Sequence, residues 1–224
     1  MDDAKRTAGR AAAELVTDGM RLGLGTGSTV AHFLDALAEA GRHVAGVPTS
    51  EATARRCREL GIALLDIADV TELDLCVDGA DELTTDLTLT KGGGGALLRE
   101  KVVASLARRS VVIATEDKLV AHLGDTFALP LEVVPFAAAS VRRAVLDLGF
   151  DEVTARGDGS YRTDNGNVIL DARVTGGIDD PAVTDLQLLR LPGLAETGLF
   201  VELATDALLA AADGQVRHLQ LSDH

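Results

Sequence analysis

Four consecutive glycines stand between ionisable side chains in the segment KGGGGALLREK, residues 91–101. Glycine loses more conformational freedom on folding than any other residue, so such a run needs a backbone reason. Directly before a helical pattern, its N–H groups can converge on an anion, helped by the positive end of the helix. Lys91, these amides and Glu100 therefore indicate proton transfer on a small anionic substrate. The alternative, a flexible linker, is disfavoured because an amphipathic pattern resumes at once.

Glu100 is the candidate base of this segment. On a helix it shares a face with an apolar stripe, which would desolvate the carboxylate and raise its pKa toward that of a useful base. The members of this stripe are Ala96, Leu97, Val103, Ala104 and Ala107. The alternative is a solvated glutamate paired with neighbouring Arg99 or Lys101.

A second motif, DGADE at residues 78–82, follows an apolar strand pattern. Only Gly79 and Ala80 separate Asp78 from Asp81, so both carboxylates can line one cleft and a substrate can approach the backbone. Paired acids in unequal environments can act as proton donor and acceptor. A magnesium site and purely structural acidic caps remain the alternatives.

A third motif is the glycine-rich turn GLGTGST at residues 23–29. It is not a dinucleotide fingerprint, because Ser28 replaces the third glycine, and it lacks the lysine of a P-loop. The amides and hydroxyls of Thr26, Gly27, Ser28 and Thr29 suit a phosphate or a polyol. A plain strand-to-helix turn, with Ser28 or Thr29 as the helix cap, is the alternative.

Charge and composition exclude several classes of protein. A net charge of −14 and a pI near 4.7 argue against nucleic acid as a partner, so an anionic ligand needs locally placed cations. Of the 21 lysine and arginine residues only four are lysines, namely Lys5, Lys91, Lys101 and Lys118. Two cysteines, five scattered histidines and no apolar run of membrane-spanning length predict a cytoplasmic protein with reduced thiols and no metal site.

Short apolar segments alternate with helical patterns in the first half of the chain, which predicts an α/β fold with a mainly parallel sheet and helices on both faces. The expected strands are 20–25, 44–48, 63–65, 73–77 and 110–114, and the expected helices are 4–16, 28–40, 50–60 and 96–108. In such folds, ligands bind at the carboxyl ends of the strands, where the glycine-rich motifs fall.

The pattern changes near residue 129, where two prolines flank a strand-like run. Helices are expected at 138–148 and 182–190, and strands at 150–155, 167–172 and 194–202. We therefore predict a separate, smaller α+β domain at 129–204. The catalytic α/β domain is expected to comprise residues 1–128 together with 205–224.

Taken in order, five motifs resemble type A ribose-5-phosphate isomerase over nearly the whole chain. They are GTGST (25–29), DGADE (78–82), KGGGGALLREK (91–101), Lys118 and DNGNVILD (164–171). The resemblance implies a Rossmann-like catalytic domain and, at residues 129–204, a ferredoxin-like α+β lid domain placed over the cleft. It also implies an aldose–ketose isomerase of the pentose phosphate pathway that interconverts ribose 5-phosphate and ribulose 5-phosphate without metal or redox cofactor.

The same resemblance implies a role for each matching residue. Glu100 matches the base that moves a proton between C2 and C1 through a cis-enediolate, and Asp81, beside Asp78, matches the residue that opens the sugar ring. Lys91 with the amides of Gly92, Gly93 and Gly94 would stabilise the enediolate. Thr26 to Thr29, Asp78 to Asp81 and Lys118 would bind the phosphosugar. Leu98 departs from the threonine often found there, a change expected to alter packing more than chemistry.

The resemblance further implies a homodimer or homotetramer with subunit contacts through the smaller domain. Two other classes remain as alternatives. A sugar-phosphate sensor on a related fold would keep the GTGST loop and Lys118 but needs no base at position 100. An acyl-CoA transferase would use a nucleophilic glutamate and form a covalent thioester.

Overall fold

The computed structural model describes residues 1–221, which form two compact units. The first contains Met1–Ala80, Arg99–Lys118 and residues 202–221, and the second contains Asp81–Leu98 and Leu119–Val201. Relative to the expected boundaries, residues 81–98 and 119–128 belong to the second unit, and residues 202–204 to the first. The expected catalytic domain ran to residue 224, and its last three residues lie outside the described part of the chain.

The first unit is built on a seven-stranded sheet with the order β14-β13-β7-β4-β1-β2-β3. Its strands are β1 (Arg21–Leu24), β2 (Ala45–Pro48), β3 (Ala63–Leu64), β4 (Leu75–Asp78), β7 (Ser110–Thr115), β13 (Asp206–Ala210) and β14 (Val216–Gln220). All neighbours are parallel except β13 and β14, which form an antiparallel pair. The expected mainly parallel sheet is confirmed.

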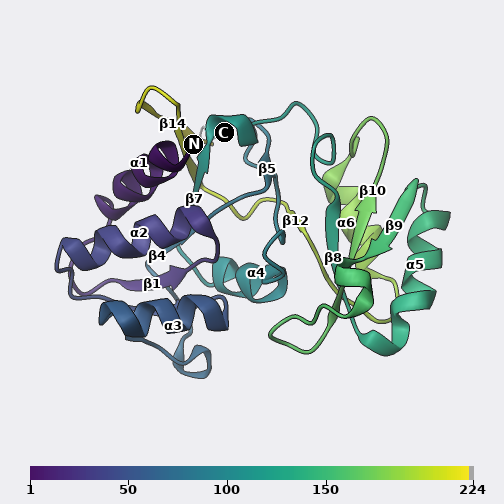
Figure 1. Ribbon diagram of the computed structural model, residues 1–224, viewed down its shortest axis with the longest axis horizontal. Coiled ribbons are helices and arrows are strands. Elements are labelled where there is room, and N and C mark those ends of the chain that lie inside the picture. The colour runs from purple at the N-terminus through teal and green to yellow at the C-terminus, as the bar shows by residue number, and fades with distance from the viewer. Residues whose placement is uncertain (222–224) are drawn as a thin grey trace. The chain divides into compact units, whose positions relative to one another are not determined.

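Helices cover both faces of this sheet, as the alternation predicted. They are α1 (Asp2–Ala13), α2 (Ser28–Glu39), α3 (Glu51–Leu60) and α4 (Leu97–Ser105), with a 3₁₀ turn η1 at Ile67–Asp69 and another, η2, at Glu116–Lys118. Leu22 and Leu24 of β1 pack in one core with residues of α1 and α2. These two helices lie side by side (Figure 1). A side chain at Gly23 would project from the opposite face of the sheet, because side chains alternate along a strand. There, an added Cβ would lie 2.6 Å from the Val103 side chain of α4.

The start of α2 differs from the prediction. Ser28 is the first helical residue, and neither Ser28 nor Thr29 is the N-cap. The N-cap is Gly27, whose φ of 125° is open to glycine and which offers no side chain to the helix amides. By contrast, Ser50 caps α3 by accepting a hydrogen bond from the Thr53 amide at 3.0 Å.

The second unit contains a four-stranded antiparallel sheet with the order β11-β8-β10-β9 and two helices. Its elements are β8 (Leu129–Val133), η3 (Pro135–Ala137), α5 (Ala138–Asp147), β9 (Glu152–Ala155), η4 (Arg156–Gly159), β10 (Val168–Arg173), α6 (Pro181–Leu189) and β11 (Leu194–Thr197). The succession βαββαβ is ferredoxin-like, as expected.

A three-stranded sheet, β12-β6-β5, completes the second unit. Its strands are β5 (Glu82–Leu83), β6 (Leu89–Thr90) and β12 (Leu199–Phe200). Antiparallel pairing of β6 with β12 ties the acidic and glycine motifs to the end of the ferredoxin-like segment. Among residues 1–221, no helix has the length and apolar character that a bilayer span requires.

Candidate functional site

Predicted site residues follow three neighbouring strands of the first unit. The loop Gly25–Thr29 follows β1, Asp78 ends β4, and Lys118 ends the turn after β7. Strand β4 pairs in parallel with both β1 and β7, so these three carboxyl ends lie at one edge of the sheet. This is the edge where open α/β sheets bind ligands.

Asp78 fixes the conformation of the Gly25–Thr29 loop. Its side chain is 6% exposed, and Oδ1 accepts hydrogen bonds from the amides of Thr26 at 3.1 Å and Gly79 at 2.7 Å. A Cβ added to Gly25 would lie 2.2 Å from Asp78 Oδ1 and 2.7 Å from its Cα. Glycine is therefore required at position 25 by the close approach of β4.

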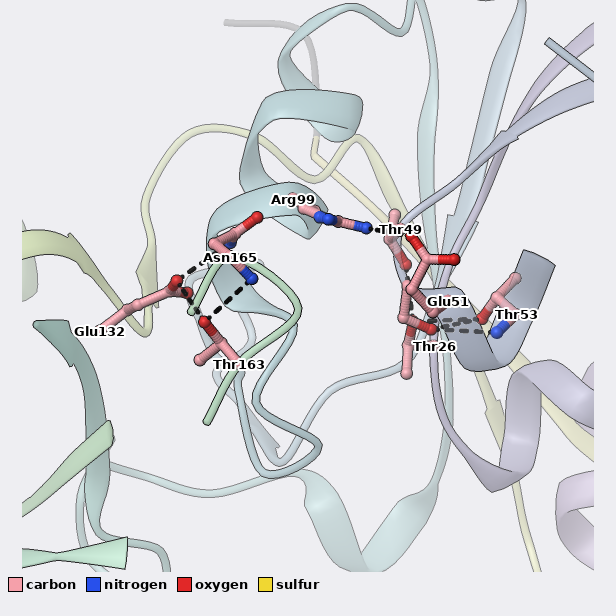
Figure 2. A network of polar contacts seen from close by, with 9 residues as sticks. Thr26, Thr49, Glu51, Thr53, Arg99, Glu132, Thr163 and Asn165 are labelled. Carbon is pink, nitrogen blue, oxygen red and sulfur yellow. Dashed lines mark hydrogen bonds and ion pairs between the residues drawn. The ribbon is translucent and has the colours of Figure 1, made fainter. Parts of the chain in front are cut away.

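The Thr26 hydroxyl belongs to a small cluster of hydroxyl groups (Figure 2). It lies 2.7 Å from the hydroxyl of Thr49, 2.8 Å from that of Ser50 and 3.2 Å from that of Thr53. Thr53 in turn donates to the Gly25 carbonyl at 2.8 Å. The Thr26 side chain thus ties the loop to the start of α3, while Gly27 and Ser28 remain exposed.

Lys5 contributes a cation that no sequence motif predicted. It lies on α1, and its Nζ donates to Ser28 Oγ at 2.8 Å. An ammonium group beside exposed loop amides is suited to a phosphate. The scarcity of lysine in the chain was the one signal that could have singled it out.

Glu100 is the fourth residue of α4 and is only 3% exposed. Val103 and Ala104, on the predicted apolar stripe, are also buried. Arg99 extends toward α3, where its Nη1 lies 3.1 Å from Glu51 Oε1 (Figure 2). The alternative of a solvated glutamate is wrong, and α4 carries a buried carboxylate in its first turn.

In the second unit, the glycine run is a defined turn. Gly92 and Gly95 have φ values of 107° and 75°, and the Gly95 amide donates to the Gly92 carbonyl at 2.9 Å. The Gly93 amide donates to Asp81 Oδ2 at 2.7 Å, and a Cβ at Gly93 would lie 2.5 Å from Asp81 Oδ1. The run is not a flexible linker, because backbone conformation and close approach each require glycine.

Lys91 precedes this turn and is buried, with 4% of its surface exposed. Its backbone amide donates to the Gly198 carbonyl at 2.8 Å, and its Nζ lies 5.5 Å from the centre of the Phe200 ring. An aromatic face attracts a cation at this distance. Strand β12 therefore packs against the Lys91 side chain inside the second unit.

Glu82 has a positioning role that the sequence did not reveal. It is fully buried, and its carboxylate accepts hydrogen bonds from the amides of Gly124 and Thr126 at 2.7 Å and of Phe127 at 2.8 Å. The Thr126 hydroxyl adds a fourth bond at 2.6 Å. Glu82 thus anchors segment 124–127 beside the strand that begins directly after Asp81.

We expect Glu82→Gln to lower the free energy of unfolding by about 3 kcal/mol, because an amide NH₂ would face buried N–H donors. Urea denaturation measures this change. The exposed Glu152 on β9 gives the control, and Glu152→Gln should stay within about 0.5 kcal/mol of the wild type. Equal stability of the two variants would refute the anchoring role.

The predicted residues divide between the two compact units. The first contains Thr26 to Thr29, Asp78 to Ala80, Glu100 and Lys118, and the second contains Asp81, Lys91 and Gly92 to Gly94. The chain passes directly from one set to the other between Ala80 and Asp81. Within residues 1–221, no group of three or more His, Cys, Asp or Glu side chains is arranged to hold a metal ion.

Known proteins resemble this chain over almost its whole length. Residues 45–214 match the family model of ribose 5-phosphate isomerase A (phosphoriboisomerase A). The ribose-5-phosphate isomerase A of Sinorhizobium medicae is 49% identical over 220 residues, which cover 94% of each chain.

Solved structures agree with this match. The ribose 5-phosphate isomerase A of Neisseria gonorrhoeae is 34% identical, with a TM-score of 0.93 over 99% of this chain and 98% of that one. A D-ribose-5-phosphate isomerase in complex with phospho-erythronic acid has the same identity and TM-score, over 98% and 99% of the two chains. The present chain belongs to the ribose 5-phosphate isomerase A family.

Proposed function

We propose that this protein interconverts D-ribose 5-phosphate and D-ribulose 5-phosphate. The observation that carries the proposal is the buried carboxylate of Glu100 in the first turn of α4, directly after the ordered glycine turn, in a chain of the isomerase A family. The sugar-phosphate sensor is not favoured, since the matched relatives are named isomerases.

Glu100 is the base of the proposed reaction. It removes the proton from C2 of the open-chain aldose and returns it to C1, through a cis-enediolate. A buried carboxylate suits this role, because its proton affinity can be set by its surroundings. Asp81, held by the Gly93 amide, assists the opening of the furanose ring.

The remaining groups bind the substrate or stabilise charge. Lys91 and the amides of Gly92 to Gly94 stabilise the negative oxygen of the enediolate, since preorganised donors and cations act most strongly where charge develops. The loop Thr26–Thr29, with Lys118 and Lys5, holds the phosphosugar. The exposed Gly27 and Ser28, with Lys5 on Ser28, support a phosphate at this loop. A related isomerase was solved in complex with phospho-erythronic acid, which supports a phosphorylated sugar derivative as the ligand class.

The proposal includes a cytoplasmic location and a homodimer or homotetramer formed through the second unit. This unit exposes several large apolar side chains, and Phe136 is fully exposed while Leu186 is 62% exposed. Contiguous exposed apolar surface is typical of subunit contacts, and these side chains are the candidates for it. Light scattering after size exclusion tests the assembly, and a monomer at micromolar concentration would contradict it.

The function is tested by ketose formation from ribose 5-phosphate in excess EDTA. We expect the purified chain to convert the substrate with the same kcat with and without the chelator, because a base with fixed amides and cations needs no metal. Activity that depends on an added metal would contradict the mechanism. A protein that binds ribose 5-phosphate without converting it would support the sensor alternative.

A further inference from the structure

Arg156 of η4 makes two hydrogen bonds to the backbone of the glycine turn. Its Nη1 donates to the carbonyl of Gly92 at 2.9 Å and to that of Gly93 at 3.0 Å. The other side of the guanidinium pairs with Asp171 of β10, with a distance of 3.0 Å from Nε to Oδ2. Arg156 is 18% exposed, so this ion pair is largely shielded from water.

These bonds determine where the adjacent amides point. In a planar trans peptide, the carbonyl and the N–H point in opposite directions. The Gly92 carbonyl shares its peptide with the Gly93 amide, which donates to Asp81 Oδ2 at 2.7 Å. The Gly93 carbonyl shares its peptide with the Gly94 amide. Arg156 therefore turns both amides away from itself, toward the side on which Asp81 lies.

Tyr161 secures the next peptide of the turn. Its hydroxyl donates to the Gly94 carbonyl at 3.1 Å, and its ring centre lies 5.7 Å from the Arg156 guanidinium carbon. Burial raises the pKa of the Tyr161 hydroxyl, which keeps it a donor. A Cβ at Gly95 would lie 2.0 Å from the Tyr161 oxygen. Three consecutive carbonyls of the glycine run are thus bound by two side chains.

The backbone directly after Arg156 is a turn with positive φ values. Gly157, Asp158 and Gly159 have φ values of 58°, 53° and 81°. A positive φ is unfavourable for an aspartate and is usually retained only where the surrounding structure demands it. This turn follows Arg156 directly in the chain.

We propose that Arg156 is a positioning residue for the isomerisation: its bonds to the carbonyls of Gly92 and Gly93 orient the amides of Gly93 and Gly94, which share those two peptides. The inference rests on the proposed function, in which these amides stabilise the enediolate and Asp81 acts on the ring. The guanidinium also polarises the two peptides and makes their N–H groups stronger donors. Asp171 holds Arg156 in place and has no direct part in the reaction.

The kinetic test compares Arg156→Gln with a matched control. Arg142→Gln also removes a guanidinium bond to a carbonyl of the second unit, since Arg142 Nε donates to Val153 O at 2.7 Å. We expect Arg156→Gln to lower kcat about 30-fold with little change in KM, because misplaced oxyanion donors act on the transition state. Arg142→Gln should retain the kcat of the wild type.

Two further variants separate positioning from stability. Arg156→Lys restores the charge but lacks the fork that reaches two carbonyls and Asp171 together, so we expect only partial recovery of kcat. Arg156→Ala should regain kcat when millimolar guanidinium chloride is added, whereas Arg142→Ala should not respond. The absence of both effects, with kcat of Arg156→Gln equal to that of Arg142→Gln, would overturn the inference.

A second readout does not depend on the substrate. The Gly93 amide proton, bonded to a carboxylate, should resonate downfield in the ¹⁵N–¹H spectrum of the wild type and move upfield in Arg156→Gln but not in Arg142→Gln. If the wild type lacks isomerase activity while this shift occurs, the proposed function fails and the orienting role stands. An unchanged Gly93 signal in Arg156→Gln would refute the orienting role itself.

Discussion

We expect Glu100→Gln to lower kcat for ribose 5-phosphate by about 10³-fold, because a carboxamide cannot accept the C2 proton. Glutamine has nearly the same shape, so substrate binding and the packing of α4 should persist. KM should therefore change far less than kcat, which is the signature of an interaction made in the transition state. Steady-state kinetics with an assay for the ketose measures both constants.

Two further variants serve as controls for the effect of Glu100→Gln on kcat. Glu14→Gln removes an exposed carboxylate just after α1 and should leave kcat unchanged. Glu100→Asp keeps the carboxylate but withdraws it by one methylene, so its kcat should lie between those of the wild type and Glu100→Gln. If Glu100→Gln retained the wild-type kcat, the base would be another residue.

Gly25→Ala should give the second largest loss. The added Cβ would fall 2.2 Å from Asp78 Oδ1 and 2.7 Å from Asp78 Cα, so β1 or β4 must shift at its carboxyl end. Asp78 would then lose its bond to the Thr26 amide, and the substrate-binding loop would be displaced. We expect kcat/KM to fall about 10²-fold and the free energy of unfolding by about 2 kcal/mol.

Gly79→Ala is the matched control for stability. This glycine adjoins the same aspartate, but the nearest atom to an added Cβ is the Ile113 carbonyl oxygen at 3.8 Å. Its thermal midpoint should equal that of the wild type, while that of Gly25→Ala falls. Equal midpoints for the two variants would mean that β1 and β4 adjust to the added methyl group.

Local patterns predicted the fold well because each element carries its own signal. Alternation of short apolar runs with helical patterns predicted the parallel sheet, and the glycine and acidic motifs of the first unit fell at its carboxyl edge. The apolar stripe beside Glu100 predicted its burial. These features depend on residues a few positions apart, which a single sequence displays directly.

Features that depend on distant residues were not predicted. Arg156 meets carbonyls 63 and 64 positions away, Glu82 binds amides 42 to 45 positions away, and Lys5 reaches Ser28 across 23 positions. No local periodicity encodes such pairs. The predicted cap of α2 was wrong for a different reason. The N-cap position has a φ of 125°, which glycine adopts readily, so Gly27 takes this position and Ser28 and Thr29 fall inside the helix.

Pairing between distant strands also explains the position of the unit boundary. Leu89 and Thr90 pair with Phe200 and Leu199, so the segment with Asp81 and the glycine turn belongs to the second unit. Strands of two residues give almost no hydrophobic pattern, and their partners lie about half the chain away. The sequence pattern changes near residue 129, and the expected boundary between the two domains rested on that change alone.

The most direct test of the account is the isomerisation of ribose 5-phosphate by the wild type in D₂O, with the ribulose 5-phosphate analysed by proton NMR. A carboxylate base that carries the proton from C2 to C1 exchanges with solvent, so we predict deuterium at C1 of the product, and at C2 of the recovered aldose. Product formed without any solvent deuterium at C1 would indicate direct hydride transfer and would contradict the role of Glu100 as the base.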